Sequence, residues 1–234
     1  MANRNAVKHA ARTGERIRGV HLTFAAPTVI EVLGSQLDFV YLDGEHGCFD
    51  SRDLEAACIA AELHGLTTIA RVPDRSSATI TRFLDRGVRG IIVPHIETVA
   101  QAREAVNATY FAPLGERSFG GSRPHFLAIA DKPAHMLARN ADISLCLMIE
   151  SRAGLDAVGE LAAVEGVDYL SFGMMDLAQS LGHSGNPGHP EVKQAVDAAR
   201  ARINAAGKRV REEFMNFAWI NDIVLAGAKA LLAS

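Results

Sequence analysis

Short apolar runs alternate along this chain with longer segments in which apolar residues recur every three or four positions. The runs Phe39–Leu42 and Leu145–Ile149 are apolar at consecutive positions, which is typical of strands buried on both faces. Segments such as Ser51–His64 carry apolar residues at helical spacing instead. Strands that alternate with helices in this way indicate βαβ units and a parallel sheet.

The alternation continues to the end of the sequence. The expected strands lie at residues 18–23, 39–42, 67–71, 90–93, 144–149, 168–172, 210–217 and 228–232. The expected helices lie at 27–34, 51–64, 76–86, 99–108, 132–140, 151–163, 190–206 and 219–226, after an amphipathic segment at 6–17. Since barrels of about 250 residues form single domains, we expect one α/β domain over residues 1–234. This would be a (β/α)₈ TIM barrel lacking the final helix.

The composition fits an ordinary globular protein, with 48% hydrophobic and 22% charged residues. A net charge of -3 offers no basic surface for nucleic acid, and no apolar run is long enough to cross a membrane. The segment Met1–Gly19 lacks the apolar stretch of a secretory signal. Cys48, Cys58 and Cys146 fit no zinc or redox spacing. We therefore expect a cytoplasmic protein.

Two acidic residues stand where predicted strands end. Glu150 follows the run Leu145–Ile149, and Asp176 follows the next strand. Active sites of α/β folds lie at this edge of the sheet, and two converging carboxylates repel each other unless a cation or a shared proton relieves them. The residues alone leave two interpretations open, a metal site or two acids that cap the helices after each strand.

Two loop segments are further candidates. The interval Phe111–Ala130 interrupts the strand and helix rhythm with glycines and prolines, and long loops in compact domains are usually functional. The turn-rich loop 182–190 contains His183 and His189. These histidines are either metal ligands or loop residues that lie in solvent or cap a turn.

Several strand-end motifs occur together with this loop. They are Leu42-Asp-Gly-Glu-His-Gly47, Ala70-Arg-Val-Pro73, Tyr110-Phe-Ala-Pro-Leu-Gly-Glu-Arg117, Met148-Ile-Glu150, Gly173-Met-Met-Asp-Leu177 and Leu181-Gly-His-Ser-Gly-Asn-Pro-Gly-His-Pro-Glu-Val192. In order and spacing they resemble the HpcH/HpaI aldolase family, the metal-dependent class II pyruvate aldolases. The resemblance covers roughly Gly19–Ala206.

The resemblance implies that Glu150 and Asp176 bind the metal. Carboxylates that leave coordination positions open suit Mg²⁺, Mn²⁺ or Co²⁺. It also implies that the backbone at Gly173, Met174 and Met175 binds the carboxylate of pyruvate, although the family usually has Pro-Ala where this chain has Met-Met.

The resemblance also assigns roles to four further residues. Arg71 would hold the keto oxygen of pyruvate, and His46 would be the acid and base, with Asp43 and Asp85 as its polar support. A fixed guanidinium can meet the charge of an enolate where it develops, and histidine can move a proton near neutral pH.

The activity implied by the resemblance is that of a lyase. It would cleave a 4-hydroxy-2-keto acid into pyruvate, or a related 2-keto acid, and an aldehyde through a metal-bound enolate. Two alternatives are a carbon–carbon bond-forming synthase, as in a citrate-synthase-like branch of the family, and a non-catalytic degenerate barrel. We also expect a homo-oligomer, because an uncovered last strand at 228–232 would promote association, with the segment 6–17 as another candidate cover. The sequence does not identify the aldehyde.

Overall fold

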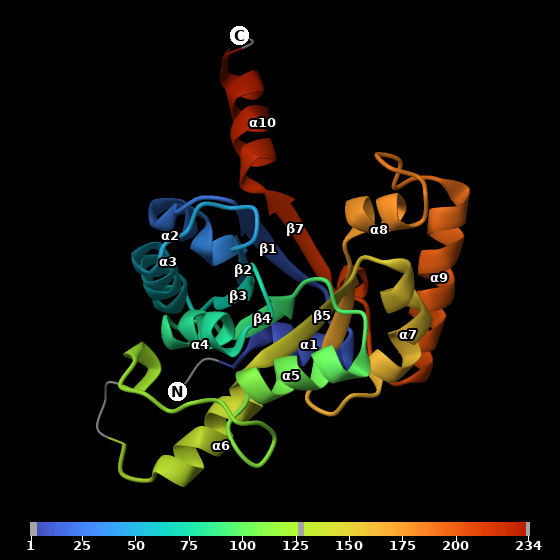
Figure 1. Ribbon diagram of the computed structural model, residues 1–234. Helices are drawn as coiled ribbons and strands as arrows, with labels where there is room; N and C mark the ends of the chain where they lie inside the picture. The colour runs from blue at the N-terminus through green and yellow to red at the C-terminus, as the bar shows by residue number, and fades with distance from the viewer. Residues whose placement is uncertain (1–3, 126–128, 233–234) are drawn as a thin grey trace.

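Seven parallel strands form one curled sheet in the computed structural model of the chain, which describes residues 4–125 and 129–232 (Figure 1). Their order is β6-β5-β4-β3-β2-β1-β7. The strands are β1 (Ile17–Leu22), β2 (Phe39–Asp43), β3 (Thr67–Arg71), β4 (Gly90–Val93), β5 (Ser144–Ile149), β6 (Tyr169–Phe172) and β7 (Met215–Trp219). The sheet is an open barrel of parallel strands, so the predicted fold class is confirmed.

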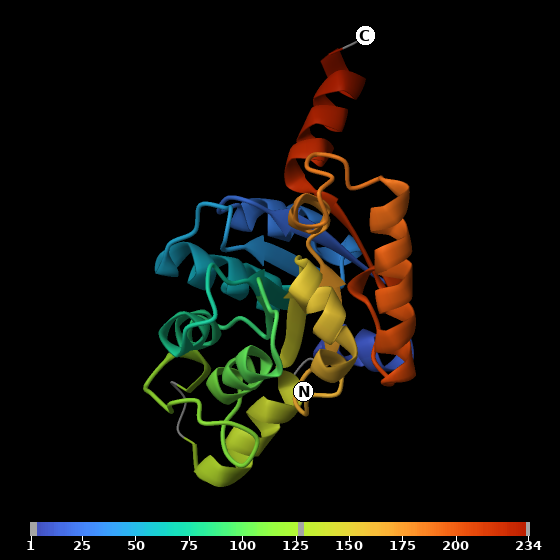
Figure 2. The ribbon, with the colours of Figure 1, turned by 45° about the vertical axis from the view of Figure 1, so that its right-hand side comes forward.

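Helices follow most strands and cover the outside of the sheet (Figures 1 and 2). They are α1 (Ala6–Thr13), α2 (Pro27–Leu33), α3 (Ser51–Leu63), α4 (Ser77–Asp85), α5 (Val99–Thr109), α6 (Lys132–Asp142), α7 (Arg152–Ala162), α8 (Met174–Ser180), α9 (Pro190–Ala205) and α10 (Ile220–Leu232). Through β6 and α9 the predicted elements agree closely with these bounds. Of the predicted functional loop Phe111–Ala130, residues 126–128 lie outside the described residues, and Arg123–His125 form a short 3₁₀ turn.

The buried side chains form two layers. One cluster lies between the sheet and the outer helices, and includes Leu54, Ile91 and Leu147. A second cluster includes Tyr41 and Met148 from the alternate strand positions, together with residues of α1. All residues of β2 and β5 are buried, as their continuous apolar runs predict.

Helix α1 closes the amino-terminal end of the barrel. The Asn5 side chain donates to the carbonyl of Arg89 at 2.8 Å, and Lys8 Nζ donates to the carbonyl of Ile143 at 2.5 Å. These carbonyls directly precede β4 and β5, at the end of the strands opposite their carboxyl edge. The amphipathic segment 6–17 therefore does not cover a last strand, and that expectation is wrong.

The carboxyl-terminal part differs most from the prediction. The expected strand 210–217 begins later, at Met215, because Arg211–Glu213 form a 3₁₀ turn. The expected helix 219–226 and strand 228–232 are one continuous helix, α10. The predicted eighth strand and the missing final helix are thus both wrong, since Ala, Leu and Lys at positions 228–232 are strong helix formers.

The position of β7 shows where the barrel departs from a complete one. β7 pairs in parallel with β1, from Ile17 opposite Met215 to His21 opposite Trp219. On its other side β7 pairs with no strand among the described residues, and the segment before it contacts β6 through a bridge between Leu170 and Val210. In a closed eight-stranded barrel the first strand pairs with the last, so β7 fills the place of the last strand and the sheet is open between β6 and β7.

Helix α10 projects away from the rest of the protein (Figures 1 and 2). Ile220 in its first turn is buried, whereas Val224, Leu225, Leu231 and Leu232 are exposed. No helix in the described ranges combines the length and the apolarity that crossing a bilayer requires.

Candidate active site

A cavity of about 350 Å³ contains most of the predicted site residues. Its lining includes His46, Arg71, Glu150, Gly173, Met174, Met175, Asp176, His21, Tyr41, Met148, Phe172, Arg211, Phe217 and Trp219. A larger hollow of about 690 Å³ lies beside α4 and α5, but none of the predicted site residues lines it. The smaller cavity is therefore the candidate active site.

Asp43 and Arg71 form the most ordered part of this site. They end the neighbouring strands β2 and β3 and lie opposite each other in the sheet register. Arg71 Nε donates to Asp43 Oδ1 at 3.1 Å, and Nη2 donates to Oδ2 at 2.6 Å. Its remaining nitrogen, Nη1, lies 3.0 Å from Glu45 Oε2. The guanidinium is thus held in one orientation by carboxylates on both sides.

Asp43 is ionised despite its burial. Burial alone would raise the pKa of this carboxyl. Contacts from His21 and Arg71 and the hydrogen bond from the His46 amide outweigh that effect and hold its pKa well below the ordinary value. Because Asp43 binds the His46 amide at 3.1 Å, it also fixes the backbone of the loop that carries His46.

Glu150 is a buried carboxylate with one unpartnered oxygen. Its Oε1 accepts a hydrogen bond of 2.6 Å from the amide of His95, whose ring Nδ1 lies 3.2 Å away. Its Oε2 makes no hydrogen bond within the described residues and lies against Gly173, where a Cβ atom would come within 2.1 Å of it. Burial raises the pKa of Glu150, and the charges of Glu45 and Asp176 add to that rise against the opposing effect of His95.

Asp176 lies in the first turn of α8, directly after β6, and its side chain is exposed. It lines the cavity together with Glu150. The alternative interpretation of Glu150 as a helix cap is wrong, because Ser151 caps α7. Two carboxylates, one buried with a free oxygen and one exposed, are a donor set of hard oxygens that fits a divalent cation such as Mg²⁺ or Mn²⁺.

Two other predicted positions have different outcomes. His46 lines the cavity and is exposed. Asp85 does not line it. This residue ends α4, at the amino-terminal edge of the sheet, and its carboxylate accepts a hydrogen bond of 2.9 Å from Arg117. Within this chain the structure does not bring Asp85 to His46, so no contact supports the predicted role of Asp85.

The sequence analysis missed four residues of this region. His21, Arg211 and Trp219 line the cavity, and His95 contacts Glu150. A polar residue inside the apolar strand β1 was the available signal for His21. The signal for His95 was its position just after β4, where Pro94 and an unusual positive φ of 55° turn the chain toward Glu150.

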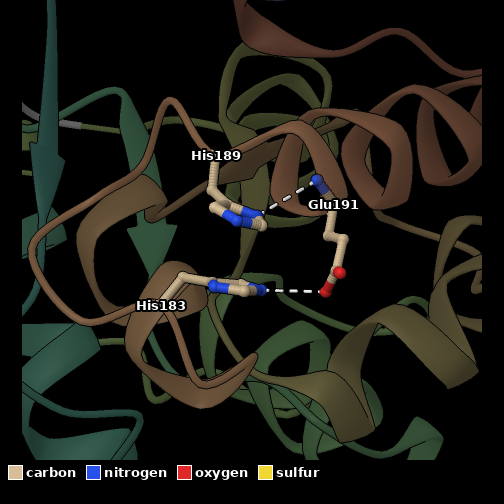
Figure 3. A group of neighbouring side chains, drawn as sticks. All are labelled: His183, His189 and Glu191. Carbon is tan, nitrogen blue, oxygen red and sulfur yellow. Dashed lines mark hydrogen bonds and ion pairs between the residues drawn. The ribbon is translucent and has the colours of Figure 1, made fainter.

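The loop histidines form a separate cluster (Figure 3). His183 Nε2 lies 2.9 Å from Glu191 Oε2, and His189 caps α9 by accepting from the Glu191 amide. Ligand atoms of the three residues lie within 4.8 Å of one another. The two rings are stacked, however, with centroids 3.6 Å apart at 15°, so their in-plane lone pairs do not converge on one point. His189 therefore caps a helix, as one of the two interpretations expects, whereas His183 contacts Glu191.

Parallel strands that carry acidic and basic side chains at their carboxyl ends are typical of TIM-barrel enzymes. The chain belongs to the HpcH/HpaI aldolase/citrate lyase family, which matches residues 18–222. It is 38% identical over 205 residues to a hydroxypyruvate/pyruvate aldolase of Deinococcus radiodurans, covering 87% of this chain and 74% of the relative. It is 32% identical to a 2-keto-3-deoxy-L-rhamnonate aldolase of Salmonella schwarzengrund, covering 87% and 77%. The protein is an aldolase of this family.

Solved structures agree with this assignment. A family protein from Burkholderia cenocepacia superimposes with a TM-score of 0.88 at 30% identity, covering 98% of each chain. The citrate synthase SbnG gives 0.84 at 28% identity, covering 97% of this chain and 95% of that one. A more distant protein, CitE from Mycobacterium tuberculosis, was solved with magnesium and acetoacetate. It gives 0.55 at 18% identity, covering 86% and 73%, which supports the fold alone.

Proposed function

We propose that this protein cleaves a 4-hydroxy-2-keto acid into pyruvate, or a closely related 2-keto acid, and an aldehyde. The observation that carries this proposal is that the buried Glu150, whose Oε2 makes no hydrogen bond to a described residue, lines the same cavity as Asp176 and Arg71. The two relatives described above are aldolases of keto acids, which supports the substrate class.

Glu150 and Asp176 would hold a divalent cation, Mg²⁺, Mn²⁺ or Co²⁺. When bound, such a cation supplies Lewis acidity to the carboxylate and keto oxygens of the substrate. The raised pKa of Glu150, which comes from burial and from its acidic neighbours, is a reason for this pair to bind a cation.

Arg71 would stabilise the negative charge that develops on the keto oxygen when the bond between C3 and C4 breaks. Asp43 and Glu45 already fix its guanidinium, so little reorganisation is needed as charge develops. His46 would accept the proton of the C4 hydroxyl as that group becomes the aldehyde and would return a proton to C3 of the enolate, since its ring is exposed at the cavity. The backbone at Gly173, Met174 and Met175 would receive the carboxylate of the keto acid.

A second candidate function is carbon–carbon bond formation between an enolate and a keto acid. The similarity to the citrate synthase SbnG supports this second function. Both reactions pass through an enolate in the same cavity, so the same side chains would serve either. A non-catalytic barrel is disfavoured by the ordered contacts of Asp43 and Arg71 and by the free oxygen of Glu150.

Proton exchange of pyruvate tests the shared step. The protein is incubated with pyruvate in D₂O, with and without Mn²⁺, and the methyl signal is followed by NMR. We expect loss of the methyl proton signal that depends on the metal. If the methyl signal persists with each of Mg²⁺, Mn²⁺ and Co²⁺, enolate chemistry is refuted. The non-catalytic barrel would then be the remaining interpretation. Cleavage assays with hydroxylated keto acids then separate the aldolase from the synthase.

A further inference from the structure

Arg211 is a second guanidinium in the cavity, contributed by the turn that precedes β7. Its side chain is only 14% exposed. Nε and Nη2 both donate to Glu212 Oε1, at 3.0 and 2.6 Å. The third nitrogen, Nη1, makes no hydrogen bond to any residue that the structure describes. One edge of this cation is therefore paired, and the other is available.

The guanidinium lies inside the barrel rather than on its surface. Its centre lies 5.4 Å from the ring of Phe217. Burial raises the pKa of Tyr41 and Cys146, on β2 and β5, and the nearby charge of Arg211 opposes both shifts. Arg211 lines the cavity together with Tyr41 of β2 and Met148 of β5, so it faces the interior that these strands surround.

Aromatic rings surround the same part of the cavity. The ring of His21 stacks on Tyr41 with centroids 4.2 Å apart, and it lies 3.9 Å from Trp219 and 5.6 Å from Phe217. His21 Nε2 lies 3.4 Å from Asp43, but neither ring nitrogen makes a hydrogen bond. A buried polar atom without a partner is costly. This part of the cavity thus combines a cation, an imidazole that contacts Asp43, and aromatic walls.

We propose that Arg211, beside the ring of His21, forms a carboxylate-binding subsite in the cavity, distinct from the strand-end residues that receive the 2-keto acid. A carboxylate there would accept from Nη1 of Arg211, in a water-poor environment where charge-assisted hydrogen bonds are strong. Arg71 already pairs with the carboxylates of Asp43 and Glu45, so Arg211 is the guanidinium that can bind a further carboxylate.

The ligand class follows from size and chemistry. A volume of about 350 Å³ accommodates a small molecule. The carboxylate is either the far end of the substrate, in which case the released aldehyde carries an acid group, or a free organic acid. Binding of the substrate's far carboxylate rests on the proposed function, whereas binding of a free organic acid does not. In both cases the subsite binds a carboxylate.

Fluorescence of Trp219 reports on this subsite directly, because it is the only tryptophan and it lines the cavity. Succinate is titrated into protein from which divalent metals have been removed, so that chelation plays no part. We expect saturable quenching, weakened about tenfold or more in Arg211→Gln by the loss of a charge-assisted hydrogen bond. Glu212→Gln should bind succinate more tightly, because it removes the competing carboxylate.

Arg86→Gln is the matched control. Arg86 also pairs with one carboxylate, Glu55 at 3.1 Å, but it lies outside the cavity. It should bind succinate as the wild type does, and circular dichroism checks the fold of every variant. Equal affinity for succinate in the wild type, Arg211→Gln and Glu212→Gln would overturn the subsite. A Trp219 fluorescence that succinate does not change in any of these proteins would also overturn it.

Kinetics distinguish the two sources of the carboxylate. In the condensation direction, 4-oxobutanoate is compared with butanal as the aldehyde. If the subsite holds the substrate, Arg211→Gln lowers kcat/KM for 4-oxobutanoate about tenfold or more relative to butanal. If Arg211→Gln instead leaves the ratio of the two kcat/KM values unchanged, and succinate competes with neither aldehyde, the ligand is a free acid. Succinate binding without pyruvate exchange would refute the proposed aldolase reaction and leave the subsite standing.

Discussion

Two groups of side chains line the same cavity and come from different parts of the chain. The strand-end group is His46, Arg71, Glu150 and Asp176, together with Asp43, which binds Arg71 but does not itself line the cavity. The closing group is His21, Arg211, Phe217 and Trp219. The strand-end group stands at or just after β2, β3, β5 and β6, where the strand and helix units repeat regularly. The closing group comes from β1 and from the irregular connection that leads through Arg211 into β7.

The two groups also differ in chemistry. The strand-end group is polar and charged, and it brings carboxylates, a guanidinium and an imidazole to the place where the proposed keto acid would react. The closing group is mainly aromatic around one cation. Because the sheet is open between β6 and β7, the side chains near that opening are less constrained by strand pairing than those at the regular strand ends. We infer that the regular part of the barrel carries the reaction and the irregular part carries recognition.

Loss of a proposed metal ligand in the strand-end group should have the largest effect on activity. Asp176→Ala removes one of the two carboxylates and should reduce activity roughly a thousandfold, the equivalent of several kcal/mol of transition-state stabilisation. Because Asp176 is exposed, the fold should persist. Activity and bound metal are measured together, with Asp156→Ala, an exposed carboxylate outside the cavity, as the control. Full metal content and activity in Asp176→Ala would show that the ligands lie elsewhere.

Substitution of the strand-end guanidinium should cost somewhat less. Arg71→Lys keeps a charge but loses the planar fork that Asp43 and Glu45 hold, so we expect about a hundredfold loss of kcat/KM. His46→Ala should slow proton exchange while pyruvate binding persists. Pyruvate affinity and methyl exchange are measured in both variants, with the exposed Arg75→Lys as the control. Identical losses of pyruvate affinity in both would contradict separate roles.

The strand-end group was predictable because its signals are local. A buried strand such as β5 appears as a continuous apolar run, and the first polar residue after it, Glu150, marks the carboxyl edge. The closing group depends on pairing between distant segments. Met215–Trp219 lies beside β1 only because the sheet closes there, and no local pattern encodes this. The same reason explains the wrong strand at 228–232, where a short apolar segment suits either a strand or a helix.

Asp85 is an informative exception within the regular part. Its assignment came from the family resemblance, yet in this chain α4 carries it to the amino-terminal edge of the sheet and Arg117 binds it. His95 is the opposite case, since its left-handed backbone conformation brings it to Glu150 without any periodic signal. A role carried over by motif still has to be checked against the contacts of the folded chain.

The ion pair at the strand ends should also make stability depend on pH. The folded-state pKa of Asp43 is depressed, so its ionised form stabilises the fold above the ordinary pKa of about 4, and this stabilisation is lost as the pH falls. Asp43→Asn should therefore be destabilised by about 2 kcal/mol at pH 7, and the difference from wild type should shrink toward pH 3. Urea unfolding measures it, with Asp156→Asn as the control. A difference that is constant with pH would assign the effect to packing instead.

The smallest expected effect concerns α10, which extends the irregular part away from the barrel. Its apolar residues include Leu225, 53% exposed, and Leu231, 78% exposed, and we expect a second copy of this chain to cover them. Leu225→Gln should weaken self-association about tenfold, because burial of one leucine contributes about 1.5 kcal/mol or more. Lys229→Gln, on the same helix, is the control. Sedimentation velocity at several concentrations measures the change. A wild-type monomer at micromolar concentration would contradict this role for α10 and leave the exposed helix without a partner of its own kind.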